Sequence, residues 1–243
     1  MDWVTVLTSC GLGYLVGSLS FARLIARIRS PSGQLEEVDL PVEGSDEDYR
    51  VRAVSASAVS LKLGPRWGFA VMALDMLKVA AATLIVKLAF TEEPYFLITA
   101  VAGMVGHVWP VYHGFRGGRG VTAVYGGLWV IDWIAIFATF LGGMFLGIVV
   151  LRNVVISYFL SLWLLIPWFW FRTHDWRYLA YAVVVNLIFV AGMIPDLKEY
   201  VRFTRMGVVH DPNDYLRQTA MGRGMLKMLS LLGGERKKPD ATD

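Results

Sequence analysis

The sequence predicts an all-α protein, a polytopic bundle of about seven transmembrane helices. Of its 243 residues, 56% are hydrophobic and only 18% are charged, whereas ordinary soluble domains carry about 25% charged residues. The hydrophobic residues gather in seven stretches, most of them near the roughly 20 residues that a helix needs to cross a bilayer. Nine Trp and ten Tyr suit the aromatic belts of membrane surfaces.

Each predicted helix is a hydrophobic stretch with polar or turn-forming residues at both of its ends. The fourth stretch is short, so that it either forms a half-span or merges with the fifth around Asp132. The seven stretches are Trp3–Ala26, Gly68–Phe90, Tyr95–Tyr112, Val121–Ile131, Ile134–Val150, Val154–Phe171 and Tyr178–Ile194.

Connections that contain basic residues alternate, for the most part, with connections that contain none. The first, third and fifth connections contain Lys or Arg, whereas the second and fourth contain neither. The sixth, with Arg172 and Arg177, departs from this alternation, and nine basic residues follow Pro195. Because Lys and Arg collect on the cytoplasmic side, we expect the N-terminus outside and the C-terminus in the cytoplasm.

Two polar regions flank or interrupt the predicted membrane domain, residues 1–195. The first is an enlarged cytoplasmic loop, 28–67, with an acidic run between Glu36 and Asp48. The second is a basic cytoplasmic tail, 196–243, in which residues 213–232 are expected to form an amphipathic helix on the inner leaflet. A single cysteine, Cys10, excludes an internal disulfide.

A polar run between two hydrophobic stretches, Gly106–Ala123, contains two His, two Arg and five Gly. One interpretation is an anion site, in which Gly117, Gly118 and Gly120 offer backbone amides and Arg119 supplies charge at the start of a helix. The alternative is a tight cytoplasmic turn, in which glycines satisfy geometry and arginines set topology. Spacing alone leaves both interpretations open.

Other polar residues lie within or beside the hydrophobic stretches. His107 is either a structural, hydrogen-bonded residue or a general acid or base. Asp75 and Lys78, three residues apart, share one helix face and form either a structural ion pair or part of a substrate pocket. Arg152 alone is a topology charge. Gly13, Gly17 and Ser18 favour close helix packing.

Four stretches together resemble the bacterial acyl-phosphate-dependent glycerol-3-phosphate acyltransferases. They are Tyr14–Phe21, Leu74–Lys78, the run Gly106–Ala123 and Arg152. The chain departs from the family in three places. An Asn- and Gly-rich motif in the first loop is absent from Arg50–Ala58, the family's Lys in the glycine run is Arg119, and a motif after the last span has no clear counterpart in Pro195–Gly207.

The resemblance implies transfer of a fatty acyl group from acyl-phosphate to glycerol 3-phosphate, giving lysophosphatidic acid and phosphate in phospholipid synthesis. It implies a bacterial plasma membrane protein with its active face in the cytoplasm, membrane lipids as partners, and no metal, cofactor or nucleic acid. The implied catalytic residues are His107, Arg119 and Lys78. The implied substrate- and phosphate-binding residues are Gly117, Gly118, Gly120, Thr122, Asp75, Arg152 and Ser18.

Two other classes of function remain open at this level. The missing motifs favour a catalytically inactive homologue that binds acyl-phosphate or phospholipid, or that acts as a scaffold for lipid enzymes. A transporter or channel is a weaker alternative, because the sequence shows no internal repeat and its polar residues gather at one membrane face.

Overall fold

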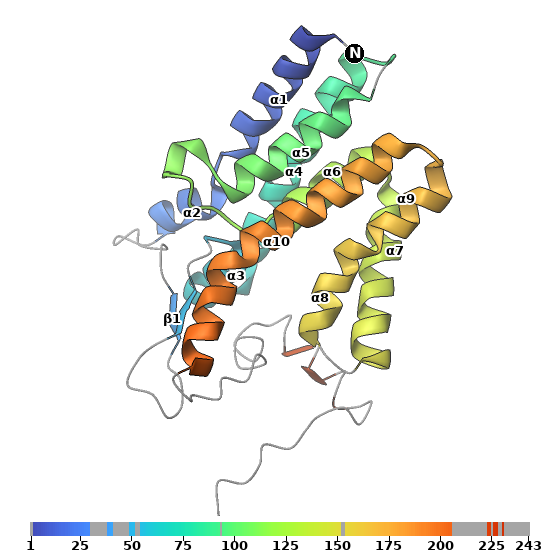
Figure 1. Cartoon of the computed structure of the whole chain (residues 1–243). Helices are drawn as coiled ribbons and strands as arrows, with labels where there is room; N and C mark the ends of the chain where they lie inside the picture. Colours follow the sequence, from blue (N-terminus) through green and yellow to red (C-terminus); the bar gives the residue numbers. More distant parts are fainter. Residues whose placement is uncertain are drawn as a thin grey trace, which may run out of the picture.

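The computed structural model describes residues 2–29, 38–40, 49–51, 54–92, 94–151, 154–205 and five residues between 223 and 230. The described chain is an elongated bundle of helices (Figure 1). Its helices are α1 (Trp3–Gly17), α2 (Phe21–Arg29), α3 (Ala56–Leu63), α4 (Pro65–Ala89), α5 (Tyr95–Val108), α6 (Val121–Ile131), α7 (Trp133–Met144), α8 (Val154–Trp163), α9 (Leu165–Thr173) and α10 (Trp176–Arg205).

The predicted helical membrane bundle is confirmed, and the hydrophobic stretches are mainly helical, although the first is broken between α1 and α2 and the sixth between α8 and α9. Within the described residues, five helical stretches are long and apolar enough to cross a membrane: Trp3–Arg29, Pro65–Ala89, Tyr95–His113, Trp133–Val150 and Trp176–Glu199. The stretch Trp133–Val150 joins α7 to a π-helical segment, Phe145–Val150. Seven spans and the orientation of the termini stay predictions.

The short fourth stretch does not merge with the fifth. Asp132 ends α6, and its side chain accepts a hydrogen bond from the amide of Ile134 (3.1 Å) at the start of α7. An aspartate that accepts from a first-turn amide is a favourable N-cap. Two separate helices therefore meet at this residue.

The loop between α2 and α3 departs from the all-α prediction. It contains a short antiparallel hairpin of β1 (Val38–Leu40) and β2 (Tyr49–Val51). Of the predicted loop 28–67, only part is described, and the predicted amphipathic helix at 213–232 lies largely outside the described residues.

Glycines allow α1 to approach α5 closely. A Cβ atom at Gly13 would overlap the carbonyl oxygen of Thr99, and one at Gly17 would overlap the backbone of Gly103. Gly106 packs in the same way on the backbone of Tyr14. Small residues at contact positions let membrane helices come together, so the packing role predicted for Gly13 and Gly17 is confirmed.

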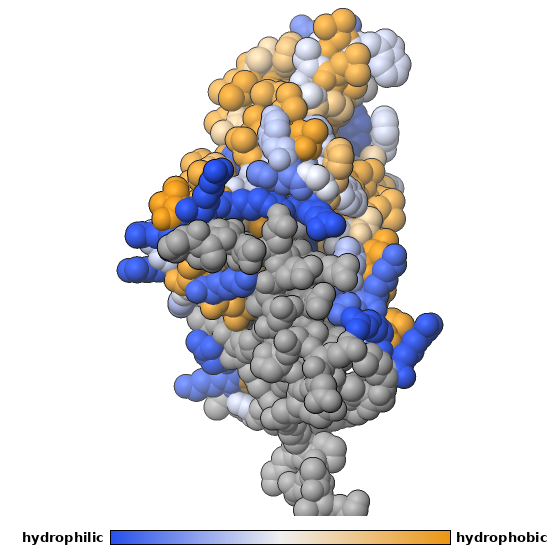
Figure 2. All heavy atoms as spheres, turned by 90° about the vertical axis from the view of Figure 1, so that its left-hand side faces the viewer, coloured by the Kyte–Doolittle hydropathy of each residue, from blue (hydrophilic) through white to orange (hydrophobic). Residues whose placement is uncertain are grey.

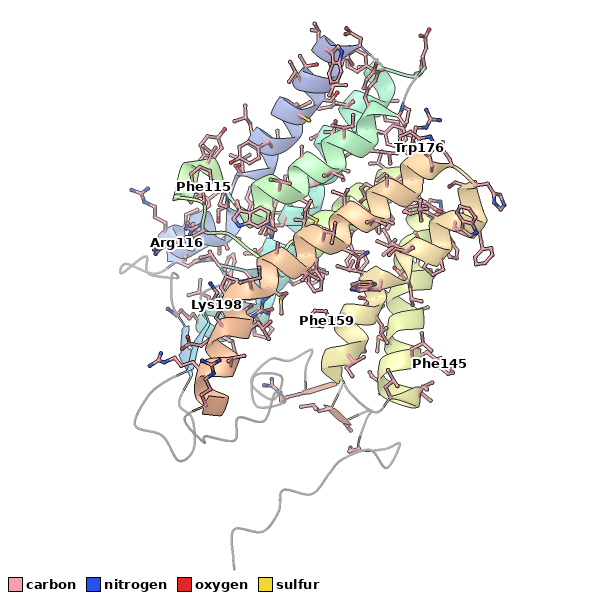
Figure 3. All side chains as sticks on the ribbon, viewed as in Figure 1. Phe115, Arg116, Phe145, Phe159, Trp176 and Lys198 are labelled. Carbon is pink, nitrogen blue, oxygen red and sulfur yellow. The ribbon has the colours of Figure 1, made fainter. Side chains whose placement is uncertain are left out.

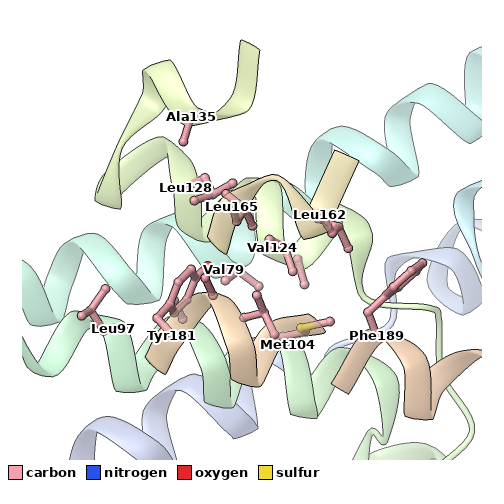
Figure 4. Packing of buried hydrophobic residues seen from close by; sticks show 14 of the residues in the cluster. Val79, Leu97, Met104, Val124, Leu128, Ala135, Leu162, Leu165, Tyr181 and Phe189 are labelled. Carbon is pink, nitrogen blue, oxygen red and sulfur yellow. The ribbon is translucent and has the colours of Figure 1, made fainter. Parts of the chain in front are cut away.

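Two hydrophobic clusters hold the helices together. The larger one joins all helices from α4 to α10 (Figure 4). Met104, Leu128, Leu165 and Phe189 in this cluster are fully buried. The smaller cluster packs α2 and α3 on the first turns of α4, around Ile25, Val59, Val71 and the half-buried Trp67.

The two arginines that break the charge alternation each pair with an aspartate. Arg172 Nε lies 3.0 Å from Asp132 Oδ2, and Arg177 Nη2 lies 2.8 Å from Asp175 Oδ2. Hydrogen bonds from the Arg177 side chain and amide lower the pKa of Asp175 below its ordinary value. Local ion pairs therefore account for the basic residues of this connection.

Candidate active site

Three ionisable side chains form a buried cluster between α4 and α5. Lys78 Nζ lies 2.7 Å from Asp75 Oδ1 and 3.3 Å from His107 Nδ1. His107 Nδ1 lies 3.8 Å from Asp75 Oδ1, and no side chain of the three is more than 7% exposed. Ionisable groups inside a membrane bundle are costly, and in general they are retained for function.

The break between α1 and α2 completes the surroundings of Lys78. Its ammonium also donates to the carbonyl of Leu19, which lies in that break, and lies 5.8 Å from the ring centroid of Phe21. An ammonium has three N–H donors, and a carboxylate, a carbonyl and an imidazole face them here. These partners offset the cost of burying the charge.

The contact with Lys78 sets the hydrogen-bonding roles of His107. A charged ammonium can only donate, so Nδ1 accepts from it and the proton of a neutral imidazole lies on Nε2. This nitrogen faces Gly118, where a Cβ atom would overlap it. The His107 ring can thus donate a hydrogen bond on the side where the glycine run covers it.

The glycines of the run let the loop close over the end of α5. The Gly118 amide donates to the His107 carbonyl (3.1 Å), and the Gly117 carbonyl accepts from the Val54 amide (3.2 Å). A Cβ atom at Gly117 would overlap the His107 carbonyl oxygen. Gly120, at φ +92°, turns the chain into α6 with a left-handed conformation that favours glycine.

These contacts bear on the anion site predicted from the glycines. The Gly118 amide and the Gly117 carbonyl both form backbone hydrogen bonds within the protein in this structure. Gly120 is the N-cap of α6, and no side chain caps the helix, so its first-turn amides keep the character of an anion site. The phosphate-binding role of the three glycines and of Thr122 stays a prediction.

Ser18 ties the end of α1 to the loop that follows α5. Its side chain is fully buried; Oγ donates to the Tyr14 carbonyl (2.7 Å) and accepts from the Val111 amide (3.3 Å). Tyr14 adds a second link, because its hydroxyl donates to the Trp109 carbonyl (3.0 Å). Ser18 thus fixes the geometry of the site as well as contributing to its wall.

A small polar cavity lies at the centre of this arrangement. Its volume is about 10 Å³, which is room for about one water molecule. The lining residues are Gly17, Ser18, Leu19, Ser20, Val54, Asp75, His107, Pro110, Gly117 and Gly118. Six of the predicted site residues therefore come together, five at the cavity wall and Lys78 bonded to Asp75.

Arg119 lies apart from this cavity. Its Nε lies 2.7 Å from Asp196 Oδ2 on α10, directly after Pro195. Gly192, one turn earlier, brings the same face of α10 close to the Arg119 backbone. Sequence reasoning missed Asp196; the available signal was an acidic residue at the start of a basic tail.

Two other residues of the glycine run, Phe115 and Arg116, lie at its outer edge (Figure 3).

The remaining predicted residues lie elsewhere. Thr122, in the first turn of α6, is half-buried and does not line the cavity. Arg152 lies outside the described residues. Within the part of the chain that the structure describes, no three His, Cys, Asp or Glu side chains converge where they could hold a metal ion.

A second hollow lies between α7 and α9. It is a groove of about 700 Å³ with mostly apolar walls, among them Phe145, Leu164, Trp168 and Phe171. Arg172, paired with Asp132, lies at its edge. The groove is much larger than the polar cavity, but the Asp75–Lys78–His107 cluster is not among its lining residues.

Known proteins are similar to this chain in both sequence and fold. A sequence model of the family described as glycerol-3-phosphate acyltransferase matches residues 7–202. The glycerol-3-phosphate acyltransferase of Shouchella clausii is 32% identical over 162 residues, which are 65% of this chain and 69% of that protein. That of Desulfotalea psychrophila is 33% identical over 173 residues, which are 68% of this chain and 79% of that protein.

Two solved structures have a fold similar to that of this chain. A crystal structure of PlsY (YgiH), an integral membrane glycerol 3-phosphate acyltransferase, in its glycerol 3-phosphate form has a TM-score of 0.63 and 25% identity, and covers 84% of this chain and 94% of that one. The lysophosphatidic acid form gives the same TM-score and coverage at 23% identity. The protein is thus a multi-pass membrane protein, and it belongs to the glycerol-3-phosphate acyltransferase family.

Proposed function

We propose that this protein transfers a fatty acyl group from acyl-phosphate to the 1-hydroxyl of glycerol 3-phosphate, at the cytoplasmic face of a bacterial plasma membrane. The observation that carries the proposal is the buried cluster of Asp75, Lys78 and His107 under the glycine run. The names of the relatives and of the PlsY structures support the acceptor. The resemblance in sequence motifs supports the donor.

The reaction that follows is an acyl substitution. The acceptor hydroxyl oxygen attacks the acyl carbonyl carbon and forms the ester bond, while the bond from that carbon to the phosphate oxygen breaks. The phosphate leaves with the bonding electrons, and the hydroxyl proton ends on the released phosphate. Since phosphate is a good leaving group, positioning and charge stabilisation can supply most of the catalysis.

His107 and Lys78 are suited to charge stabilisation in this reaction. With Nδ1 accepting from Lys78, the Nε2 proton of His107 can donate to an oxygen that gains negative charge. Lys78 supplies the positive charge behind the imidazole, and Asp75 holds Lys78 in place. This arrangement favours a substrate-orienting role for His107 over proton abstraction.

Substrate entry requires the glycine run to move. The cavity has room for about one water molecule, and its cover is the segment around Gly117 and Gly118. A lifted loop would expose the His107 ring and free the Gly118 amide for a phosphate. Arg119, which pairs with Asp196 beside this segment, is proposed to bind a substrate phosphate once the loop has lifted, and Arg152 is proposed to assist.

Phosphate release tests the proposal. The purified protein in detergent is given palmitoyl-phosphate with and without glycerol 3-phosphate, and phosphate and lysophosphatidic acid are measured together. We expect equal amounts of both products, release that depends on the acceptor, and loss of release in His107→Ala. No release from folded protein would instead favour the inactive homologue that binds acyl-phosphate or phospholipid.

A further inference from the structure

Seven of the described arginines fall into two sets. In the first set, each guanidinium lies within 4 Å of a carboxylate: Arg119 with Asp196, Arg172 with Asp132, Arg177 with Asp175 and Arg202 with Glu199. In the second set, Arg27, Arg29 and Arg66 are exposed, and no described carboxylate forms an ion pair with them. This second set lies on α2 and on the first turn of α4.

One tryptophan contacts two of these charges. The Arg29 Cζ atom lies 4.1 Å from the ring centroid of Trp67, and the Arg66 Cζ atom lies 5.4 Å from it. Trp67 itself packs into the small core of α2, α3 and α4. Cation–π contacts hold guanidinium groups against aromatic rings, so two positive charges share one rigid support and attract an anion.

Exposed apolar side chains surround these charges. Leu24 and Ile28 on α2 are 50% and 71% exposed, and Phe69 on α4 is 66% exposed. Figure 2 faces the side on which α2 lies in Figure 1 and shows hydrophilic side chains bordering hydrophobic ones. A free anion gains nothing from apolar neighbours, whereas a lipid gains contacts for its headgroup and for its acyl chains.

The position along the spans agrees with a lipid headgroup. Arg29 is the last residue of the candidate span Trp3–Arg29, and Arg66 is the second residue of the candidate span Pro65–Ala89. Arg29 lies on α2, beyond the break that follows α1, and its contact with Trp67 brings it to the start of α4. Basic residues at this depth attract anionic lipids of the cytoplasmic leaflet.

We infer that Arg29, Trp67 and Arg66 form a binding site for the phosphodiester headgroup of an anionic phospholipid. In this site α2 lies in the membrane interface, with Leu24, Ile28 and Phe69 among the acyl chains. The site is separate from the cavity around His107, so its occupancy does not depend on the proposed catalytic function.

Native mass spectrometry of the full-length protein tests this inference. The protein is released from mixed micelles with increasing phosphatidylglycerol or phosphatidylcholine, and bound lipids are counted. We expect a preference for phosphatidylglycerol, which the double substitution Arg29→Gln with Arg66→Gln weakens about tenfold or more. The matched control, Lys198→Gln with Arg205→Gln, removes the same charge from exposed positions of α10 and is expected to leave the affinity within about twofold.

Further variants keep the test decisive if the double glutamine variant does not fold. Arg29→Lys with Arg66→Lys keeps both charges and is expected to keep most of the lipid preference. Arg66→Gln alone is expected to weaken binding about threefold, since each basic residue near an anionic surface contributes to the affinity. Unfolding temperature without added phosphatidylglycerol reports the folding of each variant.

Four outcomes would overturn the inference. They are no preference in the native protein, equal weakening in both double glutamine variants, displacement of phosphatidylglycerol by millimolar inorganic phosphate, and a preference that appears only when Glu36 and Glu37 are changed to Gln. The second would indicate general attraction to the surface, and the third a site for small anions. The fourth would show that the acidic run of the chain itself fills the site.

Discussion

The two hollows of this molecule differ in size and in chemistry. The cavity beneath the glycine run holds about 10 Å³ and has Ser18, Asp75 and His107 in its wall, whereas the groove between α7 and α9 holds about 700 Å³ and is lined mostly by apolar side chains. Volume alone would favour the groove. Three buried ionisable side chains, Asp75, Lys78 and His107, meet at the cavity and none lines the groove, so the chemistry of the walls favours the cavity as the reactive site.

The largest effect is expected from removing the charge behind the imidazole. Lys78→Met should lower acyl transfer by at least about 100-fold, because it removes a preorganised positive charge from the site. It should also cost about 3 kcal/mol of unfolding free energy, since Asp75 stays buried without its partner. Phosphate release and thermal unfolding in detergent measure the two effects.

A second substitution separates activity from stability at this position. Asp75→Asn combined with Lys78→Met leaves no unpaired charge, so most of the lost stability should return while acyl transfer stays low. Acyl transfer close to that of the native protein in this double variant would show that the ion pair is structural only.

Gly118 offers a test of the cover over His107. Gly118→Ala places a methyl group where the His107 ring lies, and we expect a loss of acyl transfer of about 100-fold as the ring moves from its position. Gly11→Ala is the control, because nothing lies within 4 Å of a Cβ atom at that position. Similar activity in both variants would mean that the ring position is unimportant.

Asp196 should affect substrate affinity more than turnover. Asp196→Asn removes the carboxylate that orients Arg119, and we expect the KM for glycerol 3-phosphate to rise about tenfold, with a smaller change in kcat. Glu199→Gln, which alters the neighbouring pair with Arg202, is the matched control. A lower KM in Asp196→Asn would mean that this carboxylate competes with the substrate.

The smallest effect is expected in the apolar groove. Ala138→Leu adds three carbon atoms to its wall, and acyl transfer should stay within about twofold, as for surface substitutions far from a site. Steady-state rates with palmitoyl-phosphate measure it. A tenfold loss that grows with acyl-chain length would place the donor chain in the groove and reverse the comparison.

Much of the fold could be predicted from hydrophobic stretches, because most of them have the length and composition of a membrane helix. Helical spacing predicted that Asp75 and Lys78 share one face of α4, and the two side chains do form an ion pair there, which was one of the two predicted interpretations. The hairpin of β1 and β2 was not predicted, since the polar loop that contains it shows no strand alternation.

The surroundings of the site were harder to predict. The contact of Lys78 with His107 joins residues 29 positions apart, and that of Arg119 with Asp196 joins residues 77 apart. No periodicity along the chain encodes such contacts, because they depend on how helices pack. The spacing of the glycine motif left both an anion site and a tight turn open, and it did not show that the Gly118 amide donates to the His107 carbonyl.

Hydrogen–deuterium exchange with and without glycerol 3-phosphate tests most directly that the polar cavity is the substrate site. The proposed site predicts that the acceptor changes exchange at the end of α1 and in the segment from Gly106 to Thr122, with no change in α7 or α9. Asp75→Asn with Lys78→Met should abolish the change. A change confined to the walls of the groove, residues 138–146 and 164–172, would contradict the account.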